Sequence, residues 1–211
     1  MIEKQVKQIV KRIAVNDHIM ENMFCAPKGA LGQLGGQLMS RDQALPTWVV
    51  DLLEIHPSDA VIEIGFGPGL GLQLAAERAH QGKVIGVDPS ETMLKMARHR
   101  NHALTAAGRV ELHLGSVDQL PFADATFDKA MTMNSLHLWP DPVAGLREIR
   151  RTLRSGGRIA IAITRFSYAS ADKFEQHLTE AGFTDISIHT GEPGTCALGR
   201  VPGMPRDRSN P

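Results

Sequence analysis

The sequence predicts one α/β domain built on a mainly parallel sheet with helices on both faces. From residue 60 onward, short apolar runs alternate with helical stretches. This alternation is typical of parallel strands joined by helical crossovers. The end of the chain differs, because two strand-like runs flank Gly191-Glu192-Pro193-Gly194. Such a short glycine-containing turn is typical of a hairpin, so we expect an antiparallel pair there.

Composition limits the classes of function. The chain has 211 residues, 42% of them hydrophobic, which is enough to build the core of one domain. Lys+Arg and Asp+Glu both total 23, so no net positive charge attracts nucleic acid or an anionic membrane. We therefore expect a small-molecule ligand and no nucleic-acid partner.

Two cysteines without a Cys-x-x-Cys pair predict neither a disulfide framework nor a metal site. We expect two separate buried thiols. No apolar run is as long as a membrane span, and the polar start is unlike a secretory signal. The sequence thus predicts a cytoplasmic protein with no stable membrane association.

Residues 1–45 are predicted to form a helical cap. Apolar residues follow helical spacing over 2–23. The segment 26–36 then contains four glycines. Because glycine disfavours helix, we expect this segment to be a non-helical hinge. A cap of this kind would cover the acceptor and would not belong to the cofactor site.

The main domain is predicted over residues 46–200, beginning with a helix that starts near Pro46. The predicted strands span 60–64, 83–87, 110–114, 127–133, 158–164, 184–190 and 195–200. Helical patterns cover 72–79, 91–100, 141–153 and 171–181. Three prolines in the polar segment 201–211 predict a flexible tail.

The densest functional signal is Val-Ile-Glu-Ile-Gly-Phe-Gly-Pro-Gly-Leu-Gly at 61–71. A strand leads directly into glycines, so no Cβ separates the main chain from a ligand. The spacing does not fit the Gly-x-Gly-x-x-Gly dinucleotide fingerprint, since its third glycine would fall on Leu70 or Leu72. This mismatch argues against a nicotinamide cofactor.

Asp88 ends the next predicted strand. At that position a carboxylate can accept hydrogen bonds from both hydroxyls of a ribose. The alternative is that Asp88 only stabilises the positive end of the helix that follows. The adjacent glycine loop favours the first interpretation.

Five motifs in order resemble the class I S-adenosylmethionine-dependent methyltransferases, in particular the subgroup with the ubiquinone/menaquinone C-methyltransferases. They are Glu-Ile-Gly-Phe-Gly-Pro-Gly (63–69), Val-Asp-Pro-Ser (87–90), Gly-Ser-Val-Asp-Gln-Leu-Pro-Phe (115–122), Thr-Phe-Asp-Lys (126–129) and Leu-Arg-Ser-Gly-Gly (153–157). The resemblance covers about residues 47–200. It implies a Rossmann-like doubly wound sheet of seven strands in the order 3-2-1-4-5-7-6, with the last strand antiparallel. It also implies S-adenosyl-L-methionine as the cofactor.

The resemblance also implies roles for individual residues. The methionine half of the cofactor would lie against Glu63, Gly65, Phe66, Gly67 and Gly69. The ribose would bind Asp88, and the adenine would lie beside Pro89, Ser116, Val117 and Asp118. Asn134 would meet the cofactor's amino group, partly through its backbone carbonyl. The family usually has aspartate where this chain has Ser116, so Asp118 is expected to compensate.

Methyl transfer mainly requires that acceptor, methyl group and sulfur be aligned, so a catalytic triad is not needed. A general base is required only where the acceptor must lose a proton, and His137 is the candidate. The alternative for His137 is a structural role in its loop. Two other functions stay open: a nicotinamide-dependent oxidoreductase, and a cofactor-binding protein without transferase activity. The leading prediction is methyl transfer to a small organic acceptor by in-line displacement.

Overall fold

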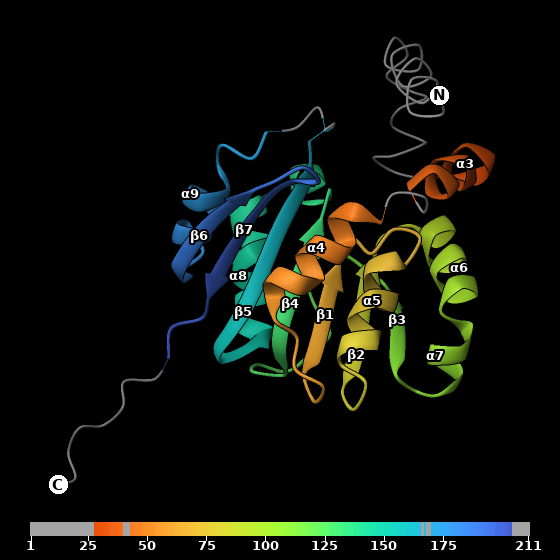
Figure 1. Cartoon of the computed structure of the whole chain (residues 1–211), viewed down its shortest axis with the longest axis horizontal. Helices are drawn as coiled ribbons and strands as arrows, with labels where there is room; N and C mark the ends of the chain where they lie inside the picture. The colour runs from red at the N-terminus through yellow and green to blue at the C-terminus, as the bar shows by residue number, and fades with distance from the viewer. Residues whose placement is uncertain (1–27, 40–42, 166, 168–169, 204–211) are drawn as a thin grey trace, which may run out of the picture.

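A seven-stranded sheet with the order β3-β2-β1-β4-β5-β7-β6 runs through the centre of the computed structural model (Figure 1). The structure describes residues 28–39, 43–165, 167 and 170–203. The strands are β1 (Ala60–Ile64), β2 (Lys83–Asp88), β3 (Val110–Leu114), β4 (Phe127–Met133), β5 (Leu153–Thr164), β6 (Thr184–Thr190) and β7 (Gly194–Arg200). The first five strands pair in parallel, and β7 runs antiparallel to both of its neighbours. Strand order and direction confirm the fold predicted from the sequence.

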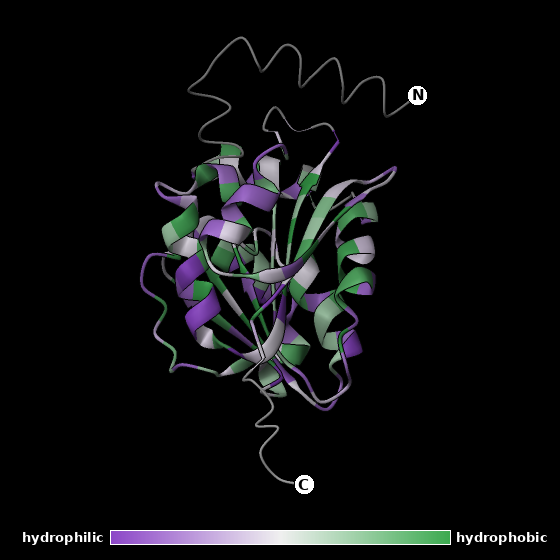
Figure 2. Cartoon of the chain, turned by 90° about the vertical axis from the view of Figure 1, so that its left-hand side faces the viewer, coloured by the Kyte–Doolittle hydropathy of each residue, from purple (hydrophilic) through white to green (hydrophobic). Residues whose placement is uncertain are grey.

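Helices cover both faces of the sheet. They are α3 (Gly29–Met39), α4 (Ala44–Leu53), α5 (Leu70–Arg78), α6 (Glu91–Arg100), α7 (His102–Ala106), α8 (Pro142–Thr152) and α9 (Phe174–Glu180). One core layer lies between the sheet and α4, α5 and α6, and a second lies between the sheet and α8 and α9. In Figure 2 the strands are mostly green, which marks hydrophobic residues, while purple hydrophilic residues gather on helices and loops.

Strand β1 shows why the strand sequences are apolar at successive positions. Val61 faces the layer with α4 and α5, while Ile62 and Ile64 face the layer with α8. Successive side chains point to opposite faces, so a strand covered on both faces is apolar throughout. Glu63 is the exception in β1, with 2% of its surface exposed. A buried carboxyl inside such a strand marks a site for function rather than for packing.

The predicted strand boundaries match β1, β3, β4 and β6, and β2 and β7 each gain one residue. Strand β5 begins five residues before the predicted 158, because Leu153 already pairs with Phe127 of β4. The short helix α7 was not predicted. Cys196 is a buried free thiol in β7, as expected, whereas Cys25 lies outside the described residues.

The prediction of a non-helical hinge at 26–36 is wrong for residues 29–36, which belong to α3. Packing accounts for the difference. A Cβ on Gly36 would lie 2.6 Å from Sδ of Met96 in α6, so the missing side chain lets the two helices touch. The helix predicted at 2–23 lies outside the described residues, as does the tail beyond residue 203.

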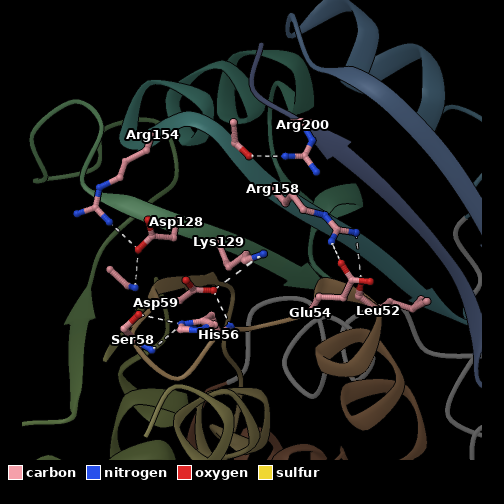
Figure 3. A network of polar contacts seen from close by, with 12 residues as sticks. Leu52, Glu54, His56, Ser58, Asp59, Asp128, Lys129, Arg154, Arg158 and Arg200 are labelled. Carbon is pink, nitrogen blue, oxygen red and sulfur yellow. Dashed lines mark hydrogen bonds and ion pairs between the residues drawn. The ribbon is translucent and has the colours of Figure 1, made fainter. Parts of the chain in front are cut away.

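Hydrogen bonds and ion pairs connect the strands at the end of the sheet where the parallel strands begin (Figure 3). The carboxylate of Asp128 accepts hydrogen bonds from the backbone N–H of Ala60 at 2.8 Å and from Arg154 at 2.6 Å. Asp59 lies 4.0 Å from the ammonium of Lys129, and Arg158 pairs with Glu54. These contacts leave the opposite edge, where the strands end, for the site.

Candidate functional site

A cleft of about 1470 Å³ lies at the carboxyl edge of the sheet. Its walls come from the β1–α5 loop, the ends of β2 and β4, the segment after β3, and helices α3 and α6. The site residues predicted from the sequence that line it are Glu63, Gly65, Phe66, Gly67, Asp88, Pro89, Ser116, Val117, Asp118 and Asn134. Gly69, the N-cap residue of α5, is not among the described residues that line the cleft.

The glycine loop leaves room for a ligand at its centre. Gly65 and Gly67 have φ angles of 71° and 52°, in the left-handed region that favours glycine. A Cβ on Gly65 would lie 2.2 Å from Oγ of Ser135, so this glycine lets the loop pack against the turn after β4. A Cβ on Gly67 would meet no described atom within 4 Å. The main chain at Gly67 is therefore open to the cleft.

Asp88 joins this loop to the end of β2. Its Oδ2 accepts the backbone N–H of Gly67 at 2.9 Å, and its Oδ1 accepts the N–H of Ser90 at 2.8 Å. The side chain of Ser90 caps α6 by accepting the N–H of Met93, so the helix does not depend on Asp88 for its cap. Burial raises the pKa of Asp88 to about 6, although both hydrogen bonds oppose the rise.

Glu63 is the second buried carboxyl of the cleft. Its Oε2 has no hydrogen-bond partner within the described part of the chain. A Cβ on Gly71 would lie 2.3 Å from its Oε1, so the first turn of α5 packs directly on the carboxyl group. Burial, and then the nearby charge of Asp88, raise the pKa of Glu63 well above its usual value. A positively charged group beside it would favour the ionised form.

The segment after β3 places its polar side chains in the cleft wall. Ser116 donates a hydrogen bond from Oγ to Oδ2 of Asp118 at 2.8 Å, so the serine orients the aspartate. The side chain of Val117 is buried and would lie 3.0 Å from a Cβ on Gly145 of α8. The carboxylate of this segment thus comes from Asp118, two residues after the position where the family usually carries it.

The turn after β4 carries two residues with predicted roles, Asn134 and His137. Asn134 has a φ of 53°, and its Oδ1 accepts the N–H of Thr164 at 2.8 Å, which ties β4 to β5. The side-chain oxygen therefore has a structural partner, and the predicted contact of Asn134 with the cofactor's amino group stays a prediction. His137 lies in a short 3-10 helix, η2 (Leu136–Leu138), and is not among the described residues that line the cleft, whereas Leu138 and Trp139 are. Its role stays a prediction.

Two further predicted residues differ in their exposure. Phe66 is buried, and its ring packs against Gly86 of β2. A Cβ on Gly86 would lie 2.6 Å from Cδ1 of Phe66, so the side chain of Phe66 faces the core. Pro89 is exposed at the cleft. The side chain of Phe66 therefore serves mainly the core, and Pro89 is the more accessible of the two.

Sequence reasoning expected a cap from residues 1–45 but a hinge at 26–36, so it missed the glutamines that α3 places in the cleft wall. Gly29, Gln33, Gln37 and Met39 line the cleft, as do Met93 and Met96 of α6. The spacing 29, 33, 37 is a helical stripe and was a usable signal, but the four glycines concealed it. The described residues hold no group of three His, Cys, Asp or Glu side chains placed to bind a metal ion. Nor does any helix among them have the length and apolarity needed to cross a membrane.

These residues fit S-adenosyl-L-methionine. Each oxygen of Asp88 accepts one backbone N–H, so each keeps a lone pair for a ribose hydroxyl. Glu63 lines the same cleft, and its Oε2, which has no hydrogen-bond partner among the described residues, is available to a ligand with cationic groups. The cofactor would lie across the ends of β2, β1 and β4, with its nucleoside half at Asp88.

Comparison with known proteins agrees with the geometry. The family model described as "Methyltransferase domain" matches residues 62–161. The "uncharacterized methyltransferase YdaC" of Bacillus subtilis is 31% identical over 182 residues, which is 80% of this chain and 98% of that protein. The demethylmenaquinone methyltransferase of Corynebacterium kroppenstedtii is 39% identical over 110 residues, 52% of this chain but only 43% of that protein.

Solved structures show the same fold at low sequence identity. A SAM-dependent methyltransferase from Aquifex aeolicus superposes with a TM-score of 0.68 at 19% identity and covers 80% of this chain and 96% of that one. Geranyl diphosphate methyltransferase in complex with GPP and sinefungin superposes with a TM-score of 0.65 at 17% identity, over 79% of this chain and 80% of that one. Fold, motifs and relatives agree, and the chain belongs to the class I S-adenosylmethionine-dependent methyltransferases.

Proposed function

We propose that the enzyme methylates a small organic acceptor bound in the same cleft, on the β4 side of the cofactor. The observation that carries this proposal is the extent of the cleft. At about 1470 Å³ it exceeds the usual range of single-ligand pockets, roughly 300–1,000 Å³. The glycine loop and Asp88 account for the part above β1 and β2. The remainder is left for a second small molecule.

The chemistry of the second part suits an organic acceptor. Strand β1 lies between β2 and β4 in the sheet, so the wall after β4 is separate from the ribose-binding carboxylate. Leu138 and Trp139 contribute apolar surface there, and Thr164 at the end of β5 contributes a hydroxyl. The indole N–H of Trp139 donates to Oγ of Ser135 at 3.0 Å, which holds the ring in one orientation. A rigid apolar wall with few polar groups is typical of small-molecule sites.

The relatives support the same class of acceptor. The demethylmenaquinone methyltransferase is named for a quinone substrate, and the geranyl diphosphate methyltransferase was solved with an isoprenoid diphosphate. Both are small organic molecules. The low identity of the second and the partial coverage of the first do not extend either substrate to this chain.

S-adenosyl-L-methionine supplies a methyl group on a positively charged sulfur, which leaves as a neutral thioether. The residues of this chain mainly hold and orient the reactants, which contributes several kcal/mol when the reacting atoms are aligned. Glu63 lies where negative charge favours binding of the cationic cofactor. The apolar wall excludes water from the acceptor. Where the acceptor must lose a proton, His137 is the proposed base, and partial burial lowers its pKa, which favours the neutral form that a base requires.

Transfer of labelled methyl from the cofactor to a panel of acceptors tests the proposal. The panel contains a hydroquinone, a catechol, an aliphatic carboxylic acid and a thiol, with total protein and RNA as macromolecular alternatives. We expect label in at least one small molecule and none in the macromolecules. Leu138→Ala should raise the KM for that acceptor about three- to tenfold, because the side chain lines the wall. Leu114→Ala is the control, since Leu114 is 50% exposed but lies outside the cleft lining.

Label found only in protein or RNA would overturn the proposal of a small acceptor. An equal effect of the two leucine variants would overturn the location of the acceptor after β4.

A further inference from the structure

Helix α3 covers one end of the cleft, although its four glycines predict a non-helical segment. We propose that α3 is part of the cofactor site. In this proposal Gln33 and Gln37 contact the nucleoside half of S-adenosyl-L-methionine. Gly36 is the positioning residue, because its missing side chain lets α3 pack directly on α6. The proposal concerns the cofactor alone and does not depend on which acceptor is methylated.

The packing of α3 on α6 is close. A Cβ on Gly36 would lie 2.6 Å from Sδ and 2.7 Å from Cε of Met96, and 3.1 Å from Cε of Met93. Distances this short leave no space for any side chain unless α3 or the methionines move. Gly32 and Gly35 are buried on the same helix. Glycine at Gly36 therefore sets how near α3 comes to the cleft floor.

The position of α6 links this contact to the cofactor. Helix α6 begins directly after Ser90, whose backbone N–H is bound by Asp88. The side chain of Met93 is fully buried in the core, so the surface on which α3 packs is held in place. Because α3 rests on Met93 and Met96, its distance from Asp88 is set by the same few residues. Figure 1 shows α3 above α6, on the β2–β3 side of the sheet.

The three faces of α3 differ in their surroundings. Gly29, Gln33 and Gln37 are four residues apart, so they form one stripe, and all three line the cleft. The stripe with Gly32 and Gly36 is buried. Leu31 and Leu34 lie elsewhere on the helix and are 39% and 47% exposed. The face directed into the cleft is thus the amide-bearing face.

Glutamine amides suit the ligand expected at this end of the cleft. Each amide offers two N–H donors and one carbonyl acceptor, which matches ribose hydroxyls and the ring nitrogens of adenine. The opposite wall carries Asp88 and Pro89. The nucleoside half of the cofactor would then lie between α3 and the end of β2, with polar partners on both sides.

Binding of S-adenosyl-L-methionine and S-adenosylhomocysteine to the full chain, measured by titration calorimetry, tests the proposal. In the double variant Gln33→Ala/Gln37→Ala, the Kd for both ligands should rise roughly ten- to a hundredfold, as expected for two lost hydrogen bonds. Leu31→Ala/Leu34→Ala is the matched control on the outer face and should leave both Kd values unchanged. The melting temperature without ligand should be the same in both double variants.

The role of Gly36 is tested by a size exchange. Gly36→Leu should raise the Kd for the cofactor about tenfold and raise its KM while kcat is retained. Adding Met96→Ala makes room for the new side chain, so the combined variant should recover most of the affinity. A purely structural role would lower the melting temperature without this split between KM and kcat. Amide exchange in residues 30–39 should slow when the cofactor is added to the wild-type chain and not to Gly36→Leu.

Unchanged cofactor affinity in the glutamine double variant would overturn the proposal, as would an equal loss in the leucine control. Should Gly36→Leu fail to fold, the glutamine variants still decide whether α3 contacts the cofactor. An acceptor KM that rises while cofactor binding is unaffected would instead make α3 a cap over the acceptor.

Discussion

Two buried carboxyls, Glu63 and Asp88, give the cleft its polar character at the scale of single residues. Backbone groups surround both carboxyls. The first turn of α5 packs on Glu63, and two backbone N–H groups donate hydrogen bonds to Asp88. Burial raises the pKa of each of them. A cationic ligand that donates hydrogen bonds compensates for this cost, so the ionisation of both groups is coupled to binding.

Cofactor affinity should therefore depend on the ionisation of Asp88. Its pKa of about 6 is above the unfolded value of 3.8, so the folded protein binds more protons between these values. The contribution of this group to stability falls as the pH rises through that window. Binding follows the opposite course, because only the carboxylate accepts both ribose hydroxyls. We expect the Kd for S-adenosyl-L-methionine to fall roughly tenfold from about pH 5 to about pH 7.5.

The variant Asp88→Asn is the control for this pH dependence. It keeps the shape of the side chain but cannot ionise, so its Kd should be roughly ten- to a hundredfold higher at neutral pH and should change less with pH than that of the wild type. A variant with the same pH profile as the wild type would show that another group titrates.

His137 gives the second prediction at this scale. If it takes a proton from the acceptor, His137→Ala should lower kcat by roughly 10²–10⁴-fold while the Kd for the cofactor is unchanged. His137→Gln should be equally inactive, because glutamine can replace a hydrogen bond but cannot accept the proton. Activity retained by the glutamine variant, or lost only in proportion to the free energy of unfolding, would assign His137 a structural role.

At the scale of elements, α8 holds the segment between β3 and β4 in place. Arg151 donates to the carbonyl oxygens of Leu120 and Phe122 at 3.2 and 2.8 Å, and it pairs with Glu148 and Asp124, both at 2.7 Å. Glu148 in turn accepts the backbone N–H of Leu120 at 2.9 Å. The segment that presents Ser116 and Asp118 to the cleft is therefore fastened to a helix far away in sequence.

Replacing this arginine should loosen the segment. In Arg151→Lys the single ammonium cannot reproduce the forked contacts, so we expect a loss of about 1–3 kcal/mol in the free energy of unfolding and a KM for the cofactor raised a few-fold. Urea unfolding and initial rates measure the two effects. Arg147→Lys is the control, since Arg147 contacts only the carbonyl of Glu180 among the described residues. Equal effects of the two variants would contradict the role of Arg151.

At the scale of the whole molecule, contacts that stabilise the fold lie where the parallel strands begin, and the candidate site lies where they end. At the edge where the strands begin, Asp128 bridges β1 and β5 through Ala60 and Arg154 (Figure 3). At the other edge the strands end in the glycine loop, Asp88 and Asn134. Burial of the strands on both faces makes the sheet between them rigid, so each edge keeps its own geometry.

Asp128→Ala should therefore affect stability and not binding. It leaves the N–H of Ala60 without its acceptor and Arg154 without its partner, so the free energy of unfolding should fall by about 1–3 kcal/mol. The Kd for S-adenosyl-L-methionine should be unchanged. Asp51→Ala, which removes an exposed ion pair with Arg78, should cost less than about 1 kcal/mol. A weaker cofactor affinity in Asp128→Ala would show that the two edges are coupled.

Residue patterns along the chain determined the positions and type of the strands and the place of the glycine loop and Asp88. These features are local, because a strand buried on both faces must be apolar and a ligand that touches the main chain requires glycine next to it. Motifs at fixed spacing also identified the family and its cofactor. For these features, the residues that carry the information are neighbours along the chain.

Only the tertiary structure decided that residues 29–39 form a helix and that this helix borders the cleft. Glycine costs about 1 kcal/mol per residue in a helix relative to alanine, so local preference argues against α3. Met93 and Met96, about sixty residues further along the chain, offset that preference through a close contact that the missing side chain of Gly36 allows. The bond from Thr164 to Asn134 and the contacts of Arg151 were equally hidden. Each depends on groups brought together by the sheet, and such long-range contacts leave no periodic or local pattern in the sequence.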